Sequence, residues 1–108
     1  MARIHRPIHI SVAHDQGAVR VVLAGELDLA SVPEVDRVLR TVATREIGRL
    51  VVDLCDVAFI DSTGLGLLVS LRNDAKRIGY QLALRPPQSE AARIFRITRT
   101  RGLFEWTD

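Results

Sequence analysis

The chain opens with alternating apolar and polar residues, a pattern that predicts a β-hairpin. Ile8, Ile10 and Val12 are separated by polar neighbours, which is the period of a half-buried strand. Residues 15–17, Asp-Gln-Gly, are a turn signal, and the stretch AVRVVLAG at 18–25 is rich in β-branched residues. We therefore expect two antiparallel strands joined by a short turn.

After this hairpin the apolar period changes to that of an amphipathic helix. Apolar side chains recur at intervals of three and four residues at Val32, Val35, Leu39 and Val42. The tetrapeptide Ser-Val-Pro-Glu at 31–34 matches a capping box, with the serine at the N-cap and the glutamate three positions later. Its proline lies in the first turn, where the missing N–H costs nothing.

The middle of the chain predicts a buried strand, a long helix and another strand. Residues 49–54, RLVVDL, form a short apolar run suited to a strand that is buried on both faces. Helical spacing returns after the polar stretch that follows and continues to Ile78, where Gly79 is a C-cap signal. Residues 80–85, YQLALR, predict the next strand.

The last part of the chain predicts a shorter helix and a final short strand. Pro86 and Pro87 interrupt the chain, residues 89–98 suit a helix, and LFEW at 103–106 suits an extended end. Strands that alternate with helices indicate an α/β fold, here a single small mixed, partly parallel sheet of four to five strands with helices packed against it. No linker or repeat interrupts the pattern, so we expect one domain over residues 1–108.

Composition narrows the class of protein further. The chain has 108 residues, of which 47% are hydrophobic and 26% are charged, as in globular domains. The net charge of +2 is too small to indicate nucleic-acid binding by itself. Cys55 is the only cysteine, so no internal disulfide forms. No apolar run reaches the ~20 residues of a membrane helix, and no secretion signal is visible. We therefore expect a cytoplasmic protein.

One stretch, FIDSTGLG at 59–66, concentrates polar and flexible residues where a strand leads into a helix. We expect Ser62 to be the N-cap, with Leu65 as the third helical residue. A helix N-terminus offers unpaired N–H groups and the positive end of a dipole, so a serine there can carry a phosphate.

The two glycines of this stretch need a reason. Gly64 and Gly66 each cost up to ~1 kcal/mol relative to alanine inside a helix. Access is one reason, because another protein can approach Ser62 closely where side chains are missing. The alternative is structural: the serine is only a cap, and the glycines only let the helix pack on the sheet.

Two segments together resemble a known family. FIDSTGLG resembles the phosphorylation-site segment of the STAS family, in particular of its anti-sigma-factor antagonists. LAGELDLAS at 23–31 is similar to the Gly-Glu-Leu-Asp stretch that ends the second strand in that family. The order of the elements, the RIG turn at 77–79 and RGLF at 101–104 also agree, so the resemblance covers nearly the whole chain.

This resemblance implies a partner switch and no enzymatic activity or cofactor in the chain itself. The unmodified protein would bind an anti-sigma factor that is also an ATP-dependent serine kinase, and would thereby free a sigma factor. Phosphorylation at Ser62, with Thr63 as the lesser alternative, would release the antagonist, and a PP2C-type phosphatase would restore it. The implied partner-binding residues are Asp28, Asp61, Ser62, Thr63, Gly64, Leu65 and Gly66.

Enzymatic and metal sites have weaker support. A serine nucleophile needs a base, and the three histidines, His5, His9 and His14, all lie near the N-terminus. On a strand His5 and His9 share a face while His14 lies on the other, and no cysteine pair or carboxylate cluster completes a metal site. We interpret them as surface histidines. Asp56 is likewise expected to be a solvated turn residue.

Binding of nucleic acid is the second alternative. A basic stripe runs through Arg93, Arg96, Arg99 and Arg101. Ile94, Phe95 and Ile97 occupy the opposite face for packing, and no aromatic platform accompanies the arginines. We interpret the stripe as a solvated face or as a rim that meets an acidic partner, without direct contact to nucleic acid.

Other roles within the fold also stay open. STAS domains occur in transporters, and as scaffolds or ligand-binding modules in stress-signalling assemblies. Many relatives continue into a final helix after the position of Asp108. A short or missing helix would leave the C-terminal edge less covered and open to weak self-association as a homodimer. Cys55 is expected to be a small buried hydrophobic residue at the end of a strand, with redox sensing as the lesser alternative.

Overall fold

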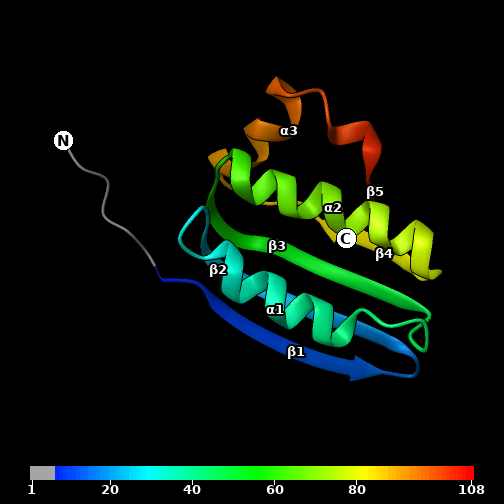
Figure 1. Cartoon of the computed structure of the whole chain (residues 1–108). Helices are drawn as coiled ribbons and strands as arrows, with labels where there is room; N and C mark the ends of the chain where they lie inside the picture. The colour runs from blue at the N-terminus through cyan, green and yellow to red at the C-terminus, as the bar shows by residue number, and fades with distance from the viewer. Residues whose placement is uncertain (1–6) are drawn as a thin grey trace.

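The computed structural model describes residues 7–108, which form a five-stranded mixed sheet with two long helices on one face (Figure 1). In chain order the elements are β1 (His9–Asp15), β2 (Ala18–Leu27), α1 (Val32–Val42), β3 (Arg49–Ile60), α2 (Ser62–Ile78), β4 (Gln81–Arg85), the 3₁₀ turn η1 (Glu90–Ala92), α3 (Arg93–Ile97), the 3₁₀ turn η2 (Arg101–Leu103) and β5 (Glu105–Trp106). This confirms the predicted α/β fold.

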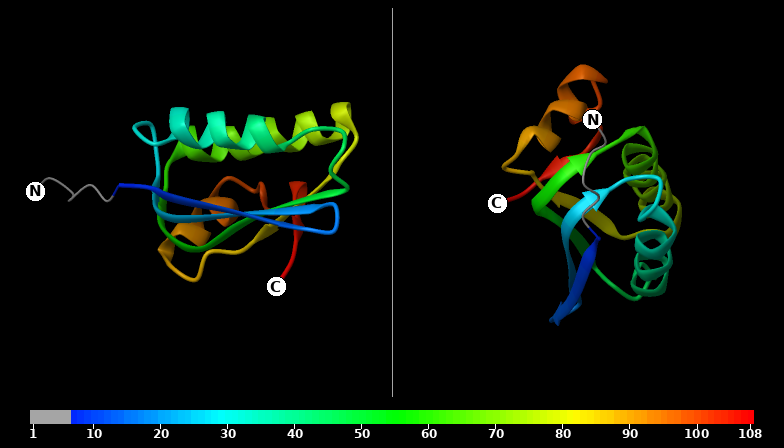
Figure 2. Two further views of the ribbon diagram at one scale, coloured as in Figure 1. Left: turned by 90° about the horizontal axis from the view of Figure 1, so that it is seen from below. Right: turned by 90° about the vertical axis from the view of Figure 1, so that its left-hand side faces the viewer.

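The strands lie in the sheet in the same order as in the chain, β1-β2-β3-β4-β5. β1 and β2 are antiparallel, and each later neighbouring pair is parallel. Figure 2 shows α1 and α2 side by side as one layer, while α3 lies apart from that layer. The carboxyl ends of the parallel strands therefore meet the start of α2 at one end of the molecule, where open α/β sheets gather their functional residues.

The core lies between the sheet and the α1–α2 layer. Alternate residues of the two central strands point into it, and helical residues at intervals of three and four fill the other side. The largest fully buried side chains include Leu23, Leu50, Leu54, Leu68 and Leu84. No helix of residues 7–108 is long and apolar enough to cross a bilayer.

Two strands extend beyond the predicted ranges. β2 continues to Leu27, and β3 continues to Ile60 rather than ending at residue 54. Asp56 therefore belongs to a strand, and our prediction of a turn residue is wrong; its exposed carboxylate simply points to water. Cys55 is half-buried in the middle of β3 rather than buried at the end of a strand.

Bulges re-aim the end of β2 toward the start of α2. The pairing of β2 with β3 shifts register between Val22 and Ala24 and again between Gly25 and Glu26. Gly25 has φ +116°, and a Cβ at this position would lie 2.5 Å from the Pro7 carbonyl oxygen. Only glycine fits there, which explains one residue of the Gly-Glu-Leu-Asp stretch by backbone geometry.

The first two predicted helices form, the third is shortened to the 3₁₀ turn η1 and the five residues of α3, and the predicted cap of α1 does not form. α1 spans the expected residues, and Ser31 occupies its N-cap position. Its hydroxyl does not cap the helix: Oγ donates to the Glu26 carbonyl at 2.7 Å and accepts from the Asp28 N–H at 3.0 Å. The capping box with Glu34 is therefore wrong, because the serine is drawn into the buried turn before the helix.

The face of the sheet opposite α1 and α2 contains a buried carboxylate. Asp53 in β3 accepts hydrogen bonds from Arg20 at 3.0 Å, from Arg85 at 3.2 Å and from the Cys55 N–H at 2.9 Å. Burial raises the pKa of the Asp53 carboxyl, but the Cys55 N–H and the two guanidinium groups lower it more, so this pKa lies below its ordinary value. This cluster ties three strands together, away from the start of α2.

Candidate functional site

The junction of β3 and α2 is organised by Asp61 rather than by Ser62. The Asp61 backbone is extended (φ −97°, ψ −176°), and its Oδ1 accepts a hydrogen bond from the Gly64 N–H at 2.9 Å. Asp61 is therefore the N-cap, Ser62 is the first helical residue, and Leu65 is the fourth. Our prediction of Ser62 as the cap is wrong by one position, since aspartate and serine are equally good caps and the sequence alone does not choose between them.

The second carboxylate oxygen of Asp61 fastens the neighbouring loop. Oδ2 accepts a hydrogen bond from the Leu29 N–H at 3.1 Å, and the Asp61 N–H donates to the Leu27 carbonyl at 3.3 Å. The two segments found in the sequence, LAGELDLAS and FIDSTGLG, are thus joined through one residue, by its side chain and its backbone N–H. This double use explains why the aspartate takes the cap position.

The Ser62 hydroxyl is left available by this arrangement. Ser62 is exposed, and its Oγ makes no hydrogen bond to any residue of the described part of the chain. The alternative in which Ser62 serves only as a cap is therefore wrong. Thr63 is half-buried, which makes its hydroxyl the less accessible of the two. A group attached to Ser62 would lie at the positive end of the α2 dipole.

The two glycines differ in what they do. A Cβ at Gly64 would collide with the Leu27 carbonyl oxygen and would lie 2.9 Å from the Leu27 Cγ. Gly64 is therefore required for packing on β2, as the structural alternative holds. A Cβ at Gly66 would meet nothing within 4 Å, and Gly66 is exposed. Access remains an explanation for Gly66 alone.

Asp28 is a buried residue of the turn that precedes α1. It is 5% exposed, and its Oδ1 accepts hydrogen bonds from the Ala30 and Ser31 N–H groups, each at 3.1 Å. Asp28 is therefore a buried residue rather than a solvated one. Asp28 orders the turn that contains Leu29, and Asp61 binds the Leu29 N–H of the same turn. Asp28 therefore acts as a buried residue that positions this turn.

The seven predicted partner-binding residues are brought to one end of the molecule but do not share one surface. Ser62 and Gly66 are exposed, and Asp61 and Thr63 are half-buried. The remaining three, Asp28, Gly64 and Leu65, are buried. Direct contact with a partner therefore remains a prediction chiefly for the exposed and half-buried members.

The structure adds an exposed apolar residue that the sequence analysis missed. Leu29 is 72% exposed at the tip of the loop held by Asp61. Its position between two loop residues gave no periodic signal. Its backbone bond to Asp61 holds Leu29 near the residue that precedes Ser62.

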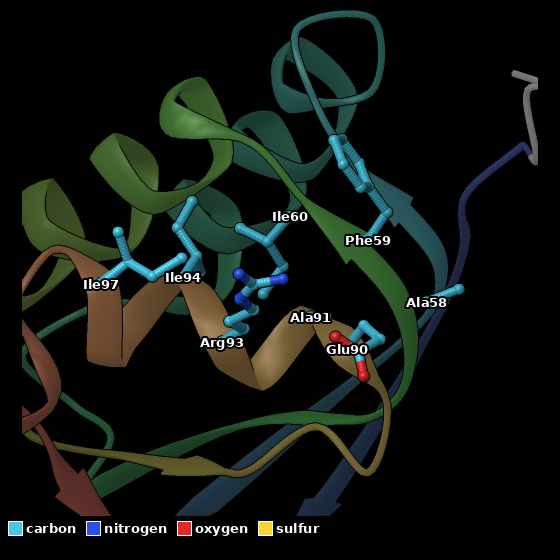
Figure 3. Close-up of a pocket in the computed structure, with 8 residues that line it drawn as sticks. All are labelled: Ala58, Phe59, Ile60, Glu90, Ala91, Arg93, Ile94 and Ile97. Carbon is cyan, nitrogen blue, oxygen red and sulfur yellow. The ribbon is translucent and has the colours of Figure 1, made fainter.

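A groove on the other side of this end of the molecule was also missed. It has a volume of about 310 Å³ and is shown in Figure 3; its lining residues are Ala58, Phe59, Ile60, Glu90, Ala91, Arg93, Ile94 and Ile97. Ile97, which we expected to pack, is 65% exposed. The prediction that Phe95 packs is confirmed, because Phe95 is 2% exposed. The same prediction is wrong for Ile97, which is the last residue of the short helix α3.

Comparison with known proteins places this chain in one family. Residues 9–107 match the family model described as STAS domain. The chain belongs to the STAS-domain family. The chain is also 31% identical over 98 residues to the anti-sigma-B factor antagonist of Bacillus subtilis (strain 168). This alignment covers 91% of this chain and 89% of that protein.

Solved structures agree with the family assignment. The crystal structure of an anti-sigma factor antagonist from Mycobacterium paratuberculosis matches with a TM-score of 0.77 and 25% identity, over 95% of this chain and 89% of that one. The unphosphorylated form of the anti-sigma factor antagonist SpoIIAA matches with a TM-score of 0.75 and 16% identity, over 93% and 89% of the two chains, and supports the fold alone.

The other candidate sites of this STAS domain do not assemble. His9 and His14 lie on the edge strand β1, and His5 lies outside the described residues. Within residues 7–108 no group of three or more histidine, cysteine or carboxylate side chains could hold a metal ion. The basic stripe is broken because α3 ends at Ile97 and Arg99 has φ +57°, so only Arg93 and Arg96 share the helix.

Proposed function

We propose that this STAS protein is an anti-sigma-factor antagonist that works by partner switching. In its unphosphorylated form it binds an anti-sigma factor and frees a sigma factor in the cytoplasm. The anti-sigma factor is also an ATP-dependent serine kinase, which transfers phosphate to Ser62 and causes release. A PP2C-type phosphatase removes the phosphate, and the antagonist itself catalyses neither step.

The accessible hydroxyl of Ser62 is the observation that carries this proposal. Asp61 supplies the helix cap, so the Ser62 hydroxyl is not used as a cap, and Ser62 occupies an exposed position in the first turn. The names of the relatives, anti-sigma-B factor antagonists at about one-third identity, support the same class of partner.

Electrostatics supplies the switch without refolding. A phosphate adds roughly −1.5 to −2 charges and three acceptor oxygens. The neighbouring Asp61 carboxylate is committed to two backbone N–H groups, so it cannot turn away from the new charge. A phosphate buried in the interface would have to lose water beside that carboxylate. A loss of ~4 kcal/mol weakens binding about a thousandfold.

Phosphate mapping tests the proposal. The anti-sigma factor of the same organism is purified and incubated with ATP and the wild-type protein, Ser62→Ala or Thr63→Ala. We expect one phosphate on the wild type and on Thr63→Ala, located at Ser62 by mass spectrometry, and none on Ser62→Ala. Phosphate at Thr63, or binding without any transfer, would instead favour a STAS scaffold that does not switch at Ser62.

A further inference from the structure

The apolar groove between the end of β3 and α3 leaves an isoleucine side chain exposed to solvent. Ile94 and Ile97 of α3 face Ile60 of β3 across it (Figure 3). Ile97 is 65% exposed. Phe95, on the same helix, is buried and packs against the rings of Phe104 and Trp106, at centroid distances of 5.9 and 5.0 Å. The packing of α3 is thus satisfied on its inner side, and its outer isoleucine is free to meet another molecule.

One wall of the groove lies close to Ser62 in the chain. Ile60 lines the groove and is followed directly by Asp61 and Ser62. On the other side of Asp61, the exposed Leu29 is held by its N–H bond to the Asp61 carboxylate. A protein that covers Ser62 therefore has two apolar contacts close to it, Leu29 and the groove.

The charges at the groove indicate what kind of side chain enters it. Arg93 lines the groove beside Ile94 and has no ion pair with any residue between 7 and 108. Glu90 lies at the opposite end, near Ala58, where the Ser89 hydroxyl fastens the turn to the Val57 carbonyl at 2.7 Å. Near its isoleucines the groove is therefore apolar with an unpaired cation at its margin.

We propose that this groove is a second docking site for the anti-sigma factor, which inserts an apolar side chain between Ile60, Ile94 and Ile97 and places a carboxylate against Arg93. This inference rests on the proposed function, since the same partner covers Ser62. The groove supplies affinity that does not depend on the phosphate, while Ser62 supplies the switch.

Two other occupants are outcomes of the test below. A symmetric dimer through this surface would set Arg93 of one copy against Glu90 of the other, and a crosslink between two copies would reveal it. Nucleic acid would meet the arginine but also an apolar floor that offers no partner to phosphate. An apolar and acidic protein surface satisfies both parts of the groove.

The test uses the purified anti-sigma factor of the same organism and the full-length antagonist, with affinity measured by calorimetry. Removing a buried isoleucine contact in Ile97→Ser should weaken binding ~10- to 100-fold. Arg93→Glu should weaken binding at least ~10-fold and most strongly at low salt, because it opposes the partner carboxylate. Val12→Ser is the matched control, since Val12 is 40% exposed on β1, and its affinity should stay within about twofold.

A photo-crosslinker at the same position identifies the occupant. With p-benzoylphenylalanine in place of Ile97, the crosslinked peptide of the anti-sigma factor should contain an apolar residue next to an aspartate or glutamate. A crosslink to a second copy or to the phosphatase, and none to the anti-sigma factor, would overturn the proposal.

The outcomes separate this inference from the proposed function. Suppose that the anti-sigma factor binds the wild type but not Ser62→Asp, and binds Ile97→Ser and Arg93→Glu as tightly as the wild type. The groove proposal is then wrong, and the switch stands. If the wild type binds no anti-sigma factor, the proposed function fails, and the groove proposal fails with it. Thermal unfolding of each variant confirms that a loss of affinity is not a loss of folding.

Discussion

The contrast between Gly64 and Gly66 leads to a prediction of opposite signs for the same substitution two residues apart. Both are glycines in the first turns of α2, and sequence propensity treats them alike. In the structure, a Cβ at Gly64 collides with the Leu27 carbonyl oxygen and lies 3.1 Å from its carbonyl carbon, whereas a Cβ at Gly66 meets nothing within 4 Å. Gly64→Ala and Gly66→Ala therefore test whether the start of α2 is packed as described.

The magnitudes follow from two competing terms. Alanine is favoured over glycine inside a helix by about 1 kcal/mol, and this gain applies at both positions. At Gly64 the new methyl meets backbone atoms of β2 that cannot move without disturbing the Asp61 N–H bond to the Leu27 carbonyl. Such overpacking costs typically ~1–3 kcal/mol, and more where rigid atoms collide. We expect Gly64→Ala to lose about 1–3 kcal/mol net, and Gly66→Ala to gain about 0.5–1 kcal/mol.

Urea unfolding and thermal melting measure both variants beside the wild type. In a domain of this size 1 kcal/mol shifts Tm by roughly 4–8 °C, so the two variants should lie on opposite sides of the wild type. Two stabilised variants, or a Gly64→Ala variant as stable as the wild type, would show that α2 does not approach β2 as closely as the structure has it.

Two further predictions concern carboxylates. Asp61→Ala removes both the cap and the bond to the Leu29 N–H, and should lower the free energy of unfolding by about 1–3 kcal/mol in urea titration, whereas the exposed Asp56→Ala should change it by no more than ~0.5 kcal/mol. The pKa of Asp53 is lower in the folded than in the unfolded chain, so its contribution is present above the unfolded value and is lost as the pH falls through the folded value. Asp53→Asn should therefore be less stable than the wild type at pH 7, by about 1–3 kcal/mol, with a gap that narrows toward pH 3; a gap independent of pH would contradict the ionic role.

The sequence predicts the elements of this fold well because their apolar periods are strong. The helix ranges near 32–42 and 62–78 and the order of elements along the chain follow from periodicity and from Gly79, which has φ +104° at the C-cap. The extension of β3 was missed because Asp56 looks like a turn residue. A strand accepts it because that side chain points outward while Val57 points into the core.

The candidate site is predicted less completely, because its roles depend on contacts between segments far apart in the chain. Asp61 and Ser62 are equally plausible caps in sequence, and the choice follows from the bond between Asp61 and Leu29, 32 residues apart. Likewise, the Ser31 hydroxyl donates to the Glu26 carbonyl instead of capping α1 as we expected. The groove could not be predicted, since its two walls come from β3 and α3 and the exposure of Ile97 is set by where α3 ends.

The most direct test of partner switching is the affinity of one anti-sigma factor for two forms of the same protein. The unphosphorylated antagonist and the antagonist phosphorylated stoichiometrically at Ser62 are titrated against the purified anti-sigma factor at one salt concentration. We predict a Kd at least about a thousandfold higher for the phosphorylated form, a loss of ~4 kcal/mol. Equal affinities for the two forms would contradict the switch and leave Ser62 without a regulatory role.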